Sequence, residues 1–426
     1  MKKFIILWLG EFISTIGSGM TSFAIGIYIY QLTKSVTLVS IATLLAYLPT
    51  ILLNPLGGIL ADRYDRRLMM ILGDLLSALG LLYILISINL GNNSVMPIFI
   101  GITISSVFIS LLEPAYKATV TDLLTEDEYA KASGMVQIAG AAKYLISPAI
   151  AGIILSFSDI RIILIIDILT IFITVFSASY VRSAISIVKP NKDNFNFFKE
   201  FKEGFKALTV NKGVMDMIVL MGFMCFFIAF IQTLMTPMIL AFADSKTLGI
   251  MESVSAIGMV VGSIVIGIIK IKKNYVRILV FSLIMSGIFM GLVGVTTNII
   301  FILIACILFF STLPFVNTCA DVLIRINIPN EVQGRAWGII SVLTQVGYVA
   351  AYCVCGVLAD KVFGPMLMEG GILAGTIGKI IGVGQGRGIG FMLIIAGIIM
   401  VITAFVLGNR KNIKQMEMRN YELVNN

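Results

Sequence analysis

Long apolar runs recur twelve times along this chain, and no other feature constrains its fold as strongly. A run of about twenty apolar residues is long enough to cross a bilayer as a helix. The runs are separated by short polar turns, several of them rich in lysine and arginine. They cover residues 4–30, 37–60, 68–90, 96–124, 132–157, 161–182, 214–242, 251–269, 278–295, 299–326, 335–358 and 391–407. The sequence therefore predicts an all-α membrane protein with twelve transmembrane helices.

Composition supports this prediction and excludes several functions. Only 13% of the residues are charged and the mean hydropathy is +1.00, whereas a soluble domain has about 25% charged residues. The net charge of +8 lies in the turns, so we interpret it as membrane orientation and not as nucleic-acid binding. The chain has no histidine, and its five cysteines show no metal-ligand spacing. We expect no metal, no cofactor and no enzymatic activity.

The runs divide into two sets of six. Residues 188–213 form the longest polar stretch between them and carry six lysines among phenylalanines at helical spacing. We interpret this stretch as a cytoplasmic linker, with an amphipathic helix on the membrane surface, between bundles at residues 1–187 and 214–426. A repeat supports the division, because Pro114 and Gly134 recur as Pro314 and Gly334. The sequence thus predicts two pseudo-symmetric six-helix bundles.

Basic residues also predict the orientation. They concentrate in the turns after the second, sixth, eighth and twelfth runs, which places these turns and both termini in the cytoplasm. We expect a multi-pass protein of a plasma membrane, because abundant Ile, Lys and Asn are typical of AT-rich bacteria. Residues 359–390 would lie outside as a flexible glycine-rich loop, with a short apolar segment at residues 372–381 that could re-enter the membrane.

The second run ends in a charged turn, Gly57-Gly58-Ile-Leu-Ala-Asp62-Arg63-Tyr-Asp65-Arg66-Arg67. It resembles the signature Gly-x-x-x-Asp-Arg-x-Gly-Arg-Arg of the major facilitator superfamily, and five positions match: Gly58, Asp62, Arg63, Arg66 and Arg67. Asp65 replaces the usual glycine. The paired glycines would allow a second helix to approach closely. The resemblance implies two bundles that rock about a central cavity, which gives alternating access.

We expect the charges of this turn to act as a conformational switch. A carboxylate at this depth needs a positive partner, and Asp62 could find it at the N-terminal end of the eleventh helix, near Arg335. Arg63 and Arg67 would hold this latch through acids at neighbouring helix ends, with Asp122 one candidate. The simpler alternative is an ordinary basic turn on the cytoplasmic side.

Several charged residues lie inside the predicted helices. Glu11, Glu113 and Lys143 fall at broadly similar depth when counted at about 1.5 Å per residue. Together they could form a neutralised cluster that releases a proton, or a static salt bridge that fixes helix packing. For Asp167 we favour a packing or hydrogen-bonding role. Asp74 is expected to pair with the basic turn that precedes it.

The fifth run contains Ser147-Pro148-Ala-Ile-Ala-Gly152. It resembles the Gly-Pro signature of drug antiporters, with Ser147 in place of glycine, and a proline among small residues allows a helix to bend and pack closely. The alternative is a proline kink with no bearing on transport direction. Across nearly its whole length the chain resembles the macrolide-efflux members of the superfamily, in its Asp-Arg-x-Asp-Arg-Arg turn, Pro114-Ala115, Ser147-Pro148 and Ile166-Asp167.

This resemblance implies a proton-driven exporter of small amphipathic drugs, macrolide-like or multidrug. Protons, such a substrate and the lipid bilayer are the expected partners, and we expect a monomer. A siderophore or metabolite exporter and an uptake symporter remain alternatives within the same fold. A membrane enzyme is the alternative outside it, but the chain offers no nucleophile–base pair that would support one.

Overall fold

A bilayer core contains no water, so a chain that crosses it satisfies its backbone hydrogen bonds within helices. In the computed structural model, twelve helices are long and apolar enough to cross a membrane among the described residues, which are 1–92, 94–183, 205, 208–209, 212–269, 273–328, 333–413 and 415–417. The all-helical, twelve-span prediction is confirmed. The predicted linker at 188–213 lies almost wholly outside the described residues.

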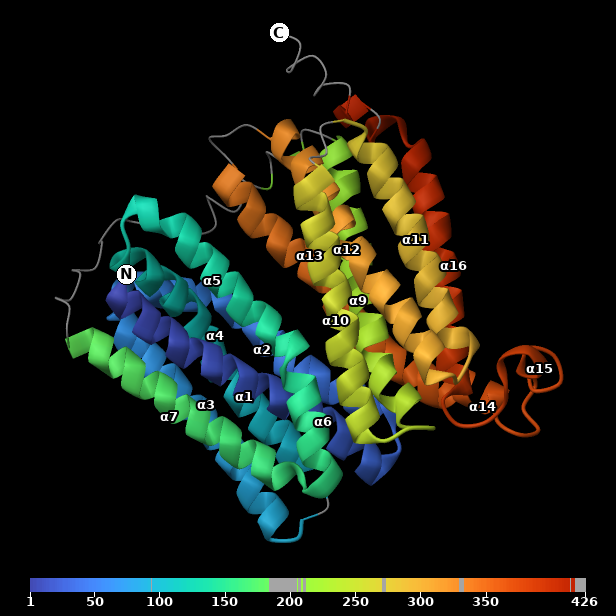
Figure 1. Cartoon of the computed structure of the whole chain (residues 1–426), viewed down its shortest axis with the longest axis horizontal. Coiled ribbons are helices and arrows are strands. Elements are labelled where there is room, and N and C mark those ends of the chain that lie inside the picture. Colours follow the sequence, from blue (N-terminus) through green and yellow to red (C-terminus); the bar gives the residue numbers. More distant parts are fainter. Residues whose placement is uncertain are drawn as a thin grey trace. The chain divides into compact units, whose positions relative to one another are not determined.

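The chain divides into two compact units. The first comprises residues 1–194 and 243–253, and the second comprises residues 195–242 and 254–426. Figure 1 shows the helices of both units. Those of the first unit are α1 (Lys2–Thr33), α2 (Val36–Arg63), α3 (Arg66–Asn89), α4 (Met96–Leu123), α5 (Glu126–Leu145), α6 (Ser147–Phe157) and α7 (Ile160–Ser183). The second unit has α9 (Lys212–Ile239), α11 (Tyr275–Val295), α12 (Ile299–Asn327), α13 (Gln333–Leu358), η2 (Ala359–Phe363), α14 (Gly364–Leu367), α15 (Gly378–Ile381) and α16 (Arg387–Asn409), while α10 (Ser245–Ile269) has residues in both.

Helix α7 shows how polar and apolar side chains are distributed on a helix that faces lipid. Its buried face carries the polar residues Asp167, Thr170, Thr174 and Ser177, while apolar side chains such as Phe176 are exposed on its other face. Gly10 and Gly17 of α1 lie against this polar stripe, because a Cβ on either would collide with Ser177 or with Thr170. Polar groups therefore point into the bundle and apolar groups point outward, as expected where lipid replaces water.

The repeat is visible in the packing of the two units. In the first unit α3 packs on α4 and α7, and in the second α11 packs on α12 and α16. Pro114 of α4 lies against Gly57 of α2, and Pro314 of α12 lies against Gly262 of α10; in both pairs the proline Cγ is 3.2 Å from a Cβ built on the glycine. A proline frees a carbonyl in the preceding turn, and the glycine allows a neighbouring helix to approach that turn.

The structure corrects the predictions for the fifth span and for residues 359–390. The fifth span is broken at Ile146 into α5 and α6, because Pro148 supplies no backbone N–H for the carbonyl four residues earlier and its ring would collide with that carbonyl in a continuous helix. Residues 359–390 are not a slack loop, since they contain η2, α14 and α15. The predicted re-entrant segment at 372–381 is reduced to the four helical residues of α15 and the turns before them.

We predict that Gly80→Ala lowers the apparent melting temperature in detergent. Gly80 of α3 faces α4, where a Cβ would collide with the Gly101 carbonyl and would lie 2.8 Å from the Ser105 nitrogen. Such overpacking costs about 1–3 kcal/mol, against a gain of roughly 1 kcal/mol in helix propensity. Gly140→Ala is the matched control, because within the described part of the chain no atom lies within 4 Å of its Cβ position. Equal melting temperatures for the two variants would contradict the close approach of α3 and α4.

Candidate functional site

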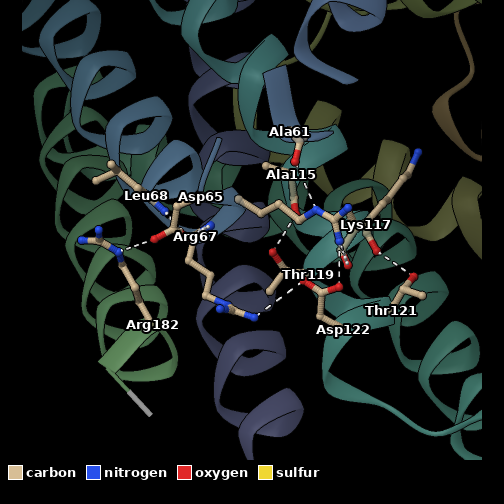
Figure 2. Close-up of polar contacts among 12 residues, drawn as sticks. Ala61, Asp65, Arg67, Leu68, Ala115, Lys117, Thr119, Thr121, Asp122 and Arg182 are labelled. Atoms are coloured by element: carbon tan, nitrogen blue, oxygen red, sulfur yellow. Dashed lines mark hydrogen bonds and ion pairs between the residues drawn. The ribbon is translucent and has the colours of Figure 1, made fainter. Parts of the chain in front are cut away.

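The charged turn between α2 and α3 is built around Asp65 (Figure 2). Its Oδ1 accepts hydrogen bonds from the backbone N–H groups of Arg67 at 3.1 Å and Leu68 at 3.4 Å, and so caps the N-terminus of α3. Its Oδ2 accepts a hydrogen bond from Arg182 Nε, at the end of α7, at 2.7 Å. The aspartate that replaces the signature glycine therefore closes the turn as a helix cap and ties it to α7.

These contacts perturb the titration of Asp65. Partial burial raises the pKa of Asp65, but hydrogen bonds from Arg182 and from the Arg67 and Leu68 N–H groups outweigh it, so the pKa is lowered from its ordinary value. An aspartate in an unfolded chain titrates near pH 3.9. Ionised Asp65 therefore contributes stability above that pH, and the contribution is lost as the pH falls through the lower pKa of the folded protein.

Asp122, at the end of α4, holds both arginines of the turn. Its Oδ1 is 2.7 Å from Arg66 Nη1, and its Oδ2 is 3.6 Å from Arg67 Nη2. Arg66 also donates to the Ala61 carbonyl at the end of α2, at 3.1 Å. Arg67 is only 2% exposed, and its Nε has no hydrogen-bond partner among the described residues. Asp122 thus neutralises a buried guanidinium and joins α2, α3 and α4 at one end of the first unit.

The remaining residues of the predicted switch are less constrained. No atom of the described residues lies within 4 Å of a Cβ built on Gly58, whereas one built on Gly57 would lie 2.6 Å from the Ser110 carbonyl. Gly57 is therefore the glycine of close approach within this unit. Arg63 is exposed. The side chains of Asp62 and Arg335 lie outside the described residues, so the latch between them stays a prediction.

Deeper in the first unit, three carboxylates from three helices form a group that we call the acid cluster: Glu11 of α1, Asp74 of α3 and Asp167 of α7. Asp74 interacts electrostatically with the other two. Asp74 and Asp167 are 4% and 2% exposed. One oxygen of each acid is buried without a hydrogen-bond partner among the described residues. A carboxylate inside a membrane span is costly, which makes these three acids candidates for functional groups.

The predicted partners are arranged differently around this cluster. Lys143 of α5 is the cation that interacts with Asp167, which is flanked by the hydroxyl groups of Thr21 and Thr170. Glu113 interacts electrostatically with Glu11, but its own ion pair is with Lys117, one turn along α4, at 2.7 Å and largely exposed. The structure thus brings Lys143 to Asp167 and connects Glu113 only indirectly to the cluster.

Sequence reasoning underrated two acids. Asp74 was expected to pair with the basic turn, but its electrostatic neighbours are acids. It lies seven residues after Arg67, and this spacing places both side chains on the same buried face of α3. Glu252 was overlooked because the eighth helix was predicted to begin at 251. In the structure α10 begins at Ser245, so Glu252 lies about two turns inside a span.

The proline signature lies where α6 begins. Ser147 is fully buried, and its hydroxyl donates to the Ile16 carbonyl of α1 at 3.0 Å. After Pro148, the Ala149 N–H donates to Ser253 Oγ at 2.9 Å. A Cβ on Gly152 would lie 2.6 Å from the Ser245 carbonyl. These contacts fall within the first unit, which includes residues 243–253, and they show that the small residues allow α6 to pack closely there.

The described residues contain no group of three or more Cys, Asp or Glu side chains arranged to hold a metal ion. The arrangement is one of buried charge at helix ends and within helices. Such a site can bind or release protons and can change helix packing when it does so.

Comparison with known proteins identifies the family. Residues 7–352 match the sequence profile of the Major Facilitator Superfamily. The chain belongs to this superfamily. Macrolide efflux protein A of Streptococcus pyogenes is 25% identical over 366 residues, which cover 84% of this chain and 90% of that protein. The protein of the same name from Enterococcus faecalis is 26% identical over 304 residues, which cover 70% of this chain and 93% of that one.

Solved structures support the same fold. The POT family transporter PepTSo superimposes with a TM-score of 0.74 over 98% of each chain at 11% identity. This similarity shows the major facilitator fold and nothing about the substrate. The chain is therefore a multi-pass membrane transporter and not an enzyme.

We predict that Asp65→Asn lowers the apparent melting temperature at pH 7 slightly, because it removes the charge opposite Arg182. The Arg182 side chain is 40% exposed, and an ion pair open to solvent in this way is worth less than about 1 kcal/mol. The amide oxygen can still cap α3. Asp65→Ala also loses the cap, at about 1 kcal/mol more. The difference between wild type and Asp65→Asn should shrink below about pH 4. A difference that stays constant with pH would contradict the assigned ion pair.

We predict a larger effect at Asp122. Asp122→Asn leaves Arg67 buried without a carboxylate, and breaking a buried pair in this way costs about 3–5 kcal/mol. Asp321→Asn is the matched control, because its pair with Arg325 at 2.8 Å is exposed at a helix surface and worth less than about 1 kcal/mol. Thermal unfolding of both variants in detergent is the measurement. Recovery of stability in Arg67→Met/Asp122→Leu would show that the unpaired charge is the cause.

Proposed function

We propose that this transporter is a proton-coupled exporter of amphipathic drugs, macrolide-like or multidrug, that works by alternating access. One observation supports export most directly, namely the similarity to proteins named macrolide efflux protein A over 84% of the chain. The broken fifth span at Ser147-Pro148, which resembles the antiporter signature, is consistent with this direction. In this proposal the protein is a monomer of the plasma membrane with both termini in the cytoplasm.

The acid cluster supports proton coupling. Asp74, Glu11 and Asp167 come from three helices, and like charges held together disfavour full ionisation. Protonation would relieve this repulsion and change how α1, α3 and α7 pack. The attraction between Lys143 and Asp167 would then become stronger or weaker with the charge of the neighbouring acids. Each step biases one conformation over another, as any coupling between proton and substrate must.

The switch at the end of α2 would complete the cycle. We propose that Asp62 pairs with the N-terminal end of α13, near Arg335, when the cytoplasmic side is closed. Asp65, Asp122, Arg66 and Arg67 would provide the rigid frame that holds the end of α2 in place. The two bundles, 1–187 and 214–426, would rock about a central cavity, with the linker at 188–213 joining them.

A siderophore or metabolite exporter and an uptake symporter are the alternative functions. Export should appear as lower drug accumulation in a drug-sensitive host that produces the protein, tested across macrolides and unrelated lipophilic cations. A proton uncoupler should abolish the difference. Accumulation of the same compounds inside inverted vesicles separates an exporter from an uptake system, because only an exporter concentrates its substrate there.

We predict that Glu11→Gln, Asp74→Asn and Asp167→Asn each abolish transport driven by a pH gradient in inverted vesicles, while substrate binding is retained. Neutralising one member removes a carboxylate whose protonation state differs between the conformations. Arg161→Gln is the control, because Arg161 forms an exposed pair with Asp159 at the start of α7 and does not belong to the acid cluster. If all three variants export like wild type, the proton is carried elsewhere.

The latch has its own test. If Asp62→Asn exports like wild type, the proposed pairing of Asp62 with the N-terminal end of α13 is wrong.

A further inference from the structure

Residues 364–386, which we call the α14–α15 segment, run from the last turn of one span of the second unit to the start of the next. One span ends at Leu367 and the next begins at Arg387. The segment therefore emerges at one membrane surface, at the end of the unit opposite the C-terminal tail.

The segment is folded by its own contacts. The Leu373 N–H donates to the Met366 carbonyl at 3.0 Å, and the Gly384 N–H donates to the Leu367 carbonyl at 2.8 Å. Leu367 is fully buried and Ile381 is 7% exposed. Positive φ angles at Gly382 and Gly386, of 94° and 79°, return the chain to α16. The segment thus has a small core that fixes which side chains point outward.

Its base is fixed to the transmembrane helices. Arg387 is 3% exposed, and its guanidinium donates to the Gly294 carbonyl at 2.7 Å and to the Thr296 carbonyl at 3.1 Å, at the end of α11. The Phe363 and Phe391 rings meet edge to face at 5.8 Å. Helix α15 packs against both α11 and α16. These contacts therefore hold the segment in one position against α11 and α16.

This folded segment nevertheless exposes isoleucines. Ile372 is 86% exposed and Ile380 is 80% exposed, and Met368 and Val383 are also exposed. Lys379 is exposed beside Ile380. Apolar side chains displayed by a well-packed segment indicate a surface that is covered in the working protein.

The position of the segment indicates what covers it. Figure 1 shows the segment extending sideways beyond α11 and α16, and not onward along their axes. Transmembrane helices stand roughly along the membrane normal, so this direction follows the membrane surface. At the same end, Ile300 and Phe301 at the start of α12 are also exposed. The isoleucines thus continue the apolar surface that faces lipid.

We propose that the α14–α15 segment is a lipid anchor, with Ile372 and Ile380 inserted at the boundary between headgroups and acyl chains of the leaflet where α16 begins. Isoleucine gains from leaving water, and the Lys379 ammonium can reach phospholipid phosphates while its stem stays in the apolar layer. Through Arg387, the anchor would fix the ends of α11 and α16 relative to the membrane. An exporter and an uptake system would both use it, so it does not depend on the proposed function.

Cysteine accessibility in lipid nanodiscs tests the anchor. Ile372→Cys, Ile380→Cys and Glu369→Cys are made singly in the full-length protein, where Glu369 is an exposed polar position of the same segment. Each is treated with a membrane-impermeant maleimide and, separately, with a lipid-soluble one, and labelling is followed peptide by peptide by mass spectrometry so that the native cysteines can stay. We expect the impermeant reagent to label Glu369→Cys several-fold faster than either isoleucine position. The lipid-soluble reagent should remove this difference.

Other labelling results would contradict the lipid anchor. If the impermeant reagent labels all three positions at the same rate, the segment lies in water and the anchor is wrong. If both reagents label the isoleucine positions slowly, or if Ile380→Cys forms disulfide-linked dimers, a protein surface covers the segment and the proposal is also wrong. Gel filtration and labelling in denaturant check that each variant is folded and that each thiol is reactive.

Discussion

The absence of water in the bilayer is the constraint on which this structure depends, because every polar group inside must find its partner in the protein. The backbone meets it by forming helices. The side chains meet it at the helix ends, where Asp122 neutralises the buried Arg67 and Asp65 caps α3 while binding Arg182. These pairs determine how the ends of α2, α3, α4 and α7 fit together at one end of the first unit. At the position where the superfamily signature has a glycine, Asp65 provides a helix cap.

The same constraint separates the acids that pair with nearby cations from those that lie beside other acids. Asp65 and Asp122 have cationic partners within 4 Å. Asp74 and Glu11 have like-charged neighbours and a buried oxygen without a partner. Arg67 and Asp74 lie on one face of α3, two turns apart. Helix α3 therefore connects the well-paired cluster at its end with the poorly paired cluster in its interior, so a shift of this helix would be felt by both.

The sequence alone was sufficient for the fold, and it located the charged turn but not the contacts that Asp65 makes there. Twelve apolar runs, a polar middle and a repeated proline are local patterns, and each has one physical interpretation in a membrane. The arrangement of the buried charges was less accessible. Glu113 and Lys143 lie at similar depth, but depth does not specify the direction in which a helix faces, and the structure pairs Glu113 with Lys117. Glu252 was missed because a helix boundary was placed six residues too late, which made a membrane-embedded acid resemble a loop residue.

Glycines illustrate the same limit. Gly57 and Gly58 are adjacent and equally capable of admitting a second helix, yet only Gly57 faces α4 within its unit. Residues 359–390 were expected to be flexible because of their glycines, but three of these glycines, Gly382, Gly384 and Gly386, provide the positive φ angles of an ordered return to α16. Glycine content alone does not distinguish a slack loop from a tightly turned one. The distinction depends on distant contacts, here the buried Arg387 and the end of α11, which fix where the turns must lead.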